Sequence, residues 1–195
     1  ARSIAPRPMS ERLHVQKRPV LRIAAVFFLF FATGMSGLVY QVVWQRYLLN
    51  VFGSTIYAIS TVLSAFMGGL ALGSWLFGRY ADRSRRLLAV YGTIEIIVGL
   101  VAVAVPAVLH LLDPVFAAAY QRFGSSFYAY SAVRFVFVFA VLLIPTTMMG
   151  GTFPLLSKFM SPEGSGIGFR AGLLYALNTP GAVVGMVLSG FYFIR

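Results

Sequence analysis

Four polar residues lie inside long apolar stretches of the sequence, where polar groups are costly: Gln41, Glu95, Arg134 and Asn178. Ionisable groups in such stretches usually face the interior of a helix bundle or a water-filled cavity. A carboxylate there could bind a cation or carry a proton, and an amide could orient a ligand by hydrogen bonds. These four residues form the candidate intramembrane polar site.

Glu95 and Arg134 each have a purely structural explanation as well. Glu95 could be a protonated buried acid or half of a structural pair, and Arg134 could extend its guanidinium to the outer interface. At the helical rise, Glu95 lies about 12 Å from one face of the membrane core and Arg134 about 9 Å from the other. A direct pair between the two residues therefore stays open.

Metal chemistry and cysteine chemistry are not expected. The chain has no cysteine and two histidines that lie far apart in sequence, so we predict no metal site, no cofactor and no thiol nucleophile. The run "GSGIG" at 164–168 precedes an apolar segment and does not follow a strand, so it does not predict a nucleotide-binding loop.

Composition predicts the environment of these residues. Of the 195 residues, 59% are hydrophobic and 11% are charged, whereas soluble domains are about 25% charged. The apolar residues come in long runs and do not alternate, which predicts an all-α integral membrane protein with five transmembrane helices. We expect the spans at about 20–44, 54–78, 87–108, 128–156 and 171–194. A helix over about 113–123 is expected on the outer surface, or else as an extension of the third span bent at Pro106.

The basic residues indicate topology. The net charge is +11, and its basic residues gather in the 1–18 tail and the 79–86 loop. This distribution follows the positive-inside rule and does not resemble a nucleic-acid-binding stripe. We predict a disordered cytoplasmic tail over 1–18, a cytoplasmic N-terminus, and a C-terminal end on the outer side of a bacterial inner membrane.

Small residues predict where helices approach closely. Such residues recur every fourth position in the second and fifth spans: Ala65, Gly69 and Gly73, and Gly181, Gly185 and Ser189. This spacing predicts internal helix packing. Prolines inside the fourth and fifth spans, Pro145, Pro154 and Pro180, are expected to break or kink those helices.

A short pattern occurs twice in the sequence, as "YAIST" at 57–61 and "YALNT" at 175–179. The two copies lie in spans of opposite direction, each ahead of its small-residue stripe. This predicts an inverted repeat of three spans plus three, in which the sixth span is missing. We accordingly expect the natural protein, or a partner chain, to continue beyond 195.

The loop after the second span carries a motif. Gly78, Asp82, Arg83 and Arg86 fit the G-x-x-x-D-R-x-G-R/K loop of the major facilitator superfamily, with Arg85 in place of the second glycine. The resemblance implies a bundle related to half of such a transporter, with a loop that braces cytoplasmic helix ends. The alternative is a basic loop whose one aspartate forms local ion pairs.

Four longer segments resemble one narrower family. They are "GMSGLVYQVVWQRYL" at 34–48, "FGSTIYAISTVLSAFMGGLALGSWLFGRYADR" at 52–83, "LLIPTTMMGGTFPLL" at 142–156 and "GLLYALNTPGAVVGMVLSGF" at 172–191. These are similar to the membrane region of the membrane-bound spermidine synthase-like proteins. The resemblance implies an anchor or polyamine-related transporter-like module, which typically precedes an aminopropyltransferase domain that this chain does not contain. Related proteins often carry an acid where Gln41 stands, so the resemblance makes cation binding at that point less favourable.

Two other functions remain open. The chain could be a non-catalytic accessory subunit that packs on a larger membrane complex. It could also be a small transporter that needs a second half to form a pathway. Each hypothesis implies contact with the lipid bilayer, and the first also implies other membrane subunits as partners.

Overall fold

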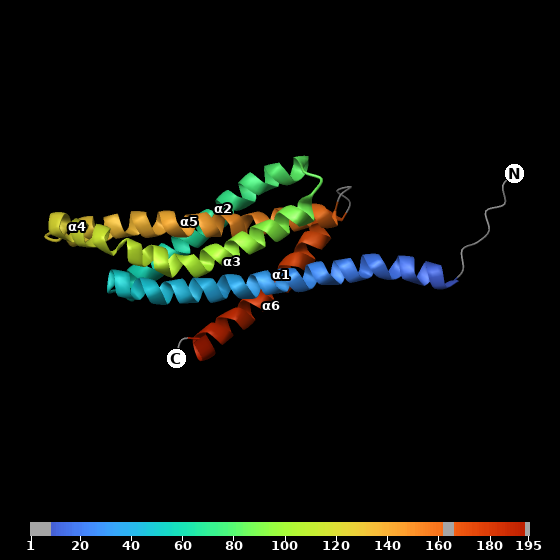
Figure 1. Cartoon of the computed structure of the whole chain (residues 1–195), viewed down its shortest axis with the longest axis horizontal. Coiled ribbons are helices and arrows are strands. Elements are labelled where there is room, and N and C mark those ends of the chain that lie inside the picture. Colours follow the sequence, from blue (N-terminus) through green and yellow to red (C-terminus); the bar gives the residue numbers. More distant parts are fainter. Residues whose placement is uncertain (1–8, 162–165, 194–195) are drawn as a thin grey trace.

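The structure is a computed structural model that describes residues 9–161 and 166–193. The described part is helical (Figure 1). Its elements are α1 Met9–Phe52, α2 Thr55–Arg83, α3 Leu87–Leu111, α4 Asp113–Phe123, α5 Phe127–Met160, α6 Ile167–Leu188 and the π-helical turn η1 Ser189–Phe193. Five of the described helices, all except α4, are long and apolar enough to cross a membrane, which confirms the all-α class and the number of spans.

The first helix differs from the prediction at both ends. Residues 9–18, predicted as a disordered tail, belong to α1, because this stretch is rich in helix formers and has no proline. At the other end α1 continues past Trp44, through Arg46 and Asn50, and stops only at Phe52. Gly53 then adopts a positive φ of 64° and donates its N–H to the Leu49 carbonyl at 2.8 Å, which ends the helix.

The helix predicted over 113–123 is α4, and it packs against the bundle. It follows α3 after the single residue Leu112 and leads to the end of the bundle where α5 begins (Figure 1). Phe116 and Ala119 are buried, and the Tyr120 ring lies 5.3 Å from the Tyr130 ring of α5. The bend lies at Leu112, whereas Pro106 stays inside α3, so α4 is a bent continuation of α3.

The prolines do not break the helices that contain them. α5 runs continuously through Pro145 and Pro154, and α6 through Pro180. A proline leaves the carbonyl four positions earlier without its helical partner. Two such carbonyls are satisfied from neighbouring helices. The Trp44 indole donates to Ala102 O, four positions before Pro106, at 3.4 Å. The Ser74 hydroxyl donates to Gly150 O, four positions before Pro154, at 3.0 Å.

Two helix pairs dominate the packing: α2 with α5, and α1 with α6. A Cβ added to Gly69 or Gly73 would collide with Thr146 or Thr147 of α5. Glycine therefore allows the α2 backbone to touch α5 directly. In the same pair, the Thr146 hydroxyl donates to the Ala65 carbonyl at 3.0 Å.

The α1–α6 pair makes the same kind of contact. A Cβ added to Gly181 or Gly185 of α6 would collide with the carbonyl oxygens of Phe31 and Met35 on α1. The third residue of this stripe, Ser189, lies beyond α6 in η1, where it is buried and donates to Gly185 O at 2.7 Å. Both small-residue stripes thus lie at contacts within the chain.

Candidate functional site

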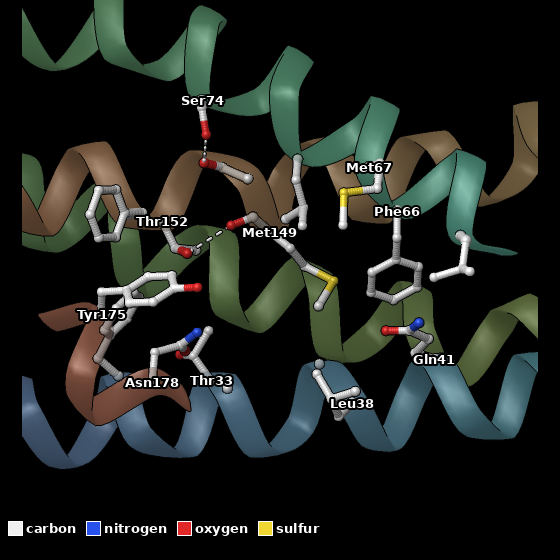
Figure 2. A pocket seen from close by; sticks show the side chains of 17 residues that line it. Thr33, Leu38, Gln41, Phe66, Met67, Ser74, Met149, Thr152, Tyr175 and Asn178 are labelled. Atoms are coloured by element: carbon white, nitrogen blue, oxygen red, sulfur yellow. Dashed lines mark hydrogen bonds between the residues drawn. The ribbon is translucent and has the colours of Figure 1, made fainter. Parts of the chain in front are cut away.

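A cavity of about 490 Å³ lies between α1, α2, α5 and α6 (Figure 2). Most of its wall is apolar, from phenylalanine, leucine, methionine and glycine. The polar groups in its wall come from all four helices: Thr33, Gln41, Ser74, Thr152, Tyr175 and Asn178. Met67 of α2 and Tyr175 of α6 line the cavity and are each 66% exposed, so it opens to the outside of the bundle between these helices.

Two of the predicted site residues, Gln41 and Asn178, both line this cavity. They come from α1 and α6 and extend toward the open space (Figure 2). Asn178 fits directly over Gly34 of α1, where any Cβ would lie 2.6 Å from the Asn178 Oδ1 atom. Within residues 9–161 and 166–193, neither amide has a hydrogen-bond partner, so both are available to a ligand.

Glu95 reaches the same cavity through Thr33. The Thr33 hydroxyl lies 2.7 Å from Glu95 Oε1 and 2.9 Å from the Tyr91 hydroxyl. It can accept a hydrogen bond from the Tyr91 hydroxyl and donate one to the Glu95 carboxylate, which orders the three groups in a chain. Since Thr33 lines the cavity, its hydroxyl group lies between the open space and the Glu95 carboxylate.

Thr33 and Tyr91 were not predicted as site residues. Tyr91 precedes Glu95 by four positions, and this spacing places both on one face of α3. That spacing was a usable signal. Thr33 carried no comparable signal, because a threonine in an apolar span usually bonds its own helix. Thr33 also has such a bond within reach, since Leu29 O lies 3.0 Å from its hydroxyl.

Arg134 lies apart from the other three predicted residues. It lines a second cavity of about 350 Å³ between α1, α3, α4 and α5, together with His110 and Asp113. Its guanidinium lies 3.8 Å from the centre of the Tyr130 ring and donates to the Tyr130 hydroxyl. The structure answers the open question of a direct pair: among the described residues Glu95 and Arg134 form no salt bridge, and each has another partner.

The facilitator-like motif is largely helical. Gly78, Asp82 and Arg83 lie in the last turns of α2, and Arg86 precedes the first residue of α3. The Asp82 carboxylate meets Lys158 Nζ of α5 at 3.2 Å. The motif thus links the ends of α2 and α5, and its aspartate forms an ion pair across helices, not within the turn.

The arrangement around the first cavity is suited to binding. It offers an apolar space, two free amides and a carboxylate that acts through a hydroxyl, and none of its described lining residues is basic. In the described part of the chain, no group of three His, Asp or Glu side chains could hold a metal ion. Comparison with protein-family models, with curated proteins and with solved structures finds no match for the chain.

Proposed function

We propose that this chain is the membrane module of a membrane-bound spermidine synthase-like protein, and that its cavity binds an amine cation with an apolar body, such as a polyamine. The observation that carries the proposal is the Thr33–Glu95 pair on the cavity wall. A carboxylate held near an otherwise apolar space favours binding of a cation, because a buried negative charge without a positive partner is costly. The segment resemblances point to the same ligand class.

The shape and chemistry of the walls support an amine with methylene segments. Apolar side chains can cover the methylene groups, while the amides of Gln41 and Asn178 accept hydrogen bonds from ammonium groups. The aromatic rings of Phe30, Phe66 and Phe153 also line the cavity and can attract a cation through their faces. Because Gln41 is neutral, Glu95 is the one carboxylate among the described residues that reaches this ligand.

The proposal includes an incomplete inverted repeat of three spans plus three, related to half of a major facilitator transporter. Its support is the pattern of helix packing. α2 of the first half packs on α5 of the second half, and α6 of the second half packs on α1 of the first half. A two-fold axis in the membrane plane would interchange these pairs.

The register of this repeat differs from the one that the pentapeptides suggested. The Gly73–Thr147 and Gly185–Met35 contacts are equivalent, and their corresponding residues lie 112 positions apart. Tyr57 and Tyr175 lie 118 positions apart. The environments of the two pentapeptides also differ, since Thr61 is buried and Thr179 is exposed. The repeat therefore rests on the glycine contacts and not on the pentapeptides.

The proposed membrane is the bacterial inner membrane, with the α2–α3 turn and the N-terminus on the cytoplasmic side. The end of the bundle with this turn carries Arg79, Arg83, Arg85 and Arg86, and also Lys158 and Arg170. The opposite end carries Arg46, Arg122 and Arg134. By the positive-inside rule, this imbalance supports a C-terminal end on the outer side.

An accessory subunit is the alternative function. Its support is the lateral opening of the cavity, where the exposed side chains of Leu63, Met67 and Tyr175 could pack against another membrane helix. In that case the isolated chain binds no amine. A partner membrane protein then copurifies and covers these residues.

The test is spermidine binding by the purified chain in lipid nanodiscs, measured by titration calorimetry. Glu95→Gln is expected to weaken binding about tenfold or more, because hydrogen bonds to charged groups contribute about 1.5–3 kcal/mol. Asp113→Asn removes one carboxylate far from the cavity and serves as the matched control. Equal affinities for the wild type and Glu95→Gln would rule out the proposed role of Glu95.

A further inference from the structure

A third hollow, of about 570 Å³, lies where α2 ends and α3 begins. One side of it is basic and hydrophilic, formed by Arg83, Ser84, Arg85 and Arg86. The other side is formed by the first turns of α3, where Ala89 is exposed, Val90 is half-buried and Ile94 is buried. The hollow is thus divided into a cationic half and an apolar half.

Among the described residues, no carboxylate neutralises Arg83, Arg85 or Arg86. Asp82, the acidic side chain that precedes them, makes its ion pair with Lys158 of α5 at 3.2 Å. In the part of the chain that the structure describes, no other carboxylate forms a salt bridge with Arg83, Arg85 or Arg86. Three guanidinium groups within four positions repel one another, and an anion in the hollow would relieve this repulsion.

Hydrogen-bond donors of the backbone add to the positive charge. α3 begins after Arg86 without a side-chain cap, so the N–H groups of its first turn are open at this hollow. The Ser84 oxygen accepts the Arg86 N–H at 3.3 Å, which leaves the Ser84 hydroxyl proton free to donate. These donors and the arginines together match the oxygens of a phosphate group.

Aromatic residues indicate how deep in the membrane the hollow lies. Tyr80 lines it and is 48% exposed, and the Arg79 guanidinium lies 4.2 Å from the centre of the Trp75 ring one turn earlier. Tryptophan and tyrosine with neighbouring basic residues are typical of the membrane–water interface. An occupant at this depth would present phosphate to the arginines and hydrocarbon to Ala89 and Val90.

We propose that this hollow binds the phosphate headgroup of an anionic membrane phospholipid, with the start of its acyl chains against α3. Basic pockets between membrane helices are suited to such headgroups. A soluble phosphate would satisfy the arginines but leave the apolar half of the hollow uncovered. The site is separate from the amine cavity, because the two share no lining residue.

The test compares lipid binding to the purified chain in detergent by native mass spectrometry. We expect the wild type to prefer phosphatidylglycerol over phosphatidylcholine about tenfold or more, because each basic residue near the surface contributes about 1 kcal/mol. The double variant Arg83→Gln with Arg86→Gln should lose most of this preference. The matched control, Arg46→Gln with Arg122→Gln, removes two exposed arginines at the other end of the bundle and should keep it.

Two further measurements test the shape of the hollow and its preference for lipid over free phosphate. Ala89→Phe narrows the hollow without a change in charge and should also lower the preference for phosphatidylglycerol. Inorganic phosphate should not displace the lipid from the wild type. The proposal fails if the Arg83/Arg86 variant keeps the preference, if the Arg46/Arg122 control loses as much, if Ala89→Phe has no effect, or if inorganic phosphate alone displaces the lipid.

Discussion

Gly73 of α2 and Gly185 of α6 make equivalent contacts with neighbouring helices. In each case a Cβ would collide with a backbone carbonyl oxygen, of Thr147 on α5 for the first and of Met35 on α1 for the second. The obstacle is backbone in both cases, so a side-chain movement cannot relieve it. Backbone therefore lies directly against backbone in both helix pairs.

Gly73→Ala is expected to destabilise the bundle by about 1–3 kcal/mol, because the α2 and α5 backbones must move apart to admit the methyl group. The measurement is the free energy of unfolding in a sodium dodecyl sulfate titration. Gly99→Ala of α3 is the matched control, since a Cβ there meets no atom within 4 Å. If both variants unfold at the same detergent fraction, the proposed packing is incorrect.

Ser74→Ala should cost about 1 kcal/mol, because the Gly150 carbonyl loses its donor next to Pro154. The cost should largely disappear in a Pro154→Ala background, where the substituted residue supplies the helical N–H to the same carbonyl. A double-mutant cycle of unfolding free energies measures this coupling. Additive effects of the two substitutions would contradict the explanation of how α5 tolerates its proline.

Thr33→Val should destabilise the chain by about 1–3 kcal/mol. The substitution keeps the shape of the side chain but leaves the Glu95 carboxylate and the Tyr91 hydroxyl without the group that joins them. Thr93→Val is a control on the same helix as Glu95, because Thr93 is exposed and bonds only Ala89 O of its own helix. Thermal unfolding of the two variants should separate them clearly.

Asn178→Leu should weaken spermidine binding about tenfold and change the unfolding free energy by less than about 1 kcal/mol. Leucine has nearly the same branched shape, and the described residues offer the amide no hydrogen bond that the protein would lose. Binding and unfolding are measured on the same preparation. Thr179→Val, at the next position and exposed, should leave both unchanged. An unchanged affinity in Asn178→Leu would exclude the amide from ligand recognition.

The number and class of the helices could be predicted from the sequence because hydropathy and length decide them together. Helix ends were less predictable. The sequence between Trp44 and Gly53 contains Arg46 and Asn50, which suggested a loop, yet nothing in it opposes a helix until the glycine. The same applies to Asp82 and Arg83, which remain in the last turn of α2.

The grouping of the polar residues could be predicted only in part. Gln41 and Asn178 both line one cavity, and Glu95 joins them through Thr33. Arg134 does not line this cavity. The sequence predicts how deep a residue lies in the membrane, but not which neighbouring helix its side chain faces. The consequences of the prolines could also be predicted only in part. A sequence shows the carbonyl that a proline frees, but not the Trp44 or Ser74 side chain that another helix supplies to it.

The glycine contacts also have a mechanical consequence. They join α2 to α5 and α1 to α6 by direct backbone contact, whereas α1 with α2 and α5 with α6 share thinner interfaces. Each joined pair can therefore move as one stiff body, and the cavity has walls from both bodies. A small rocking of one pair against the other would widen or narrow the cavity without separating any glycine from its carbonyl.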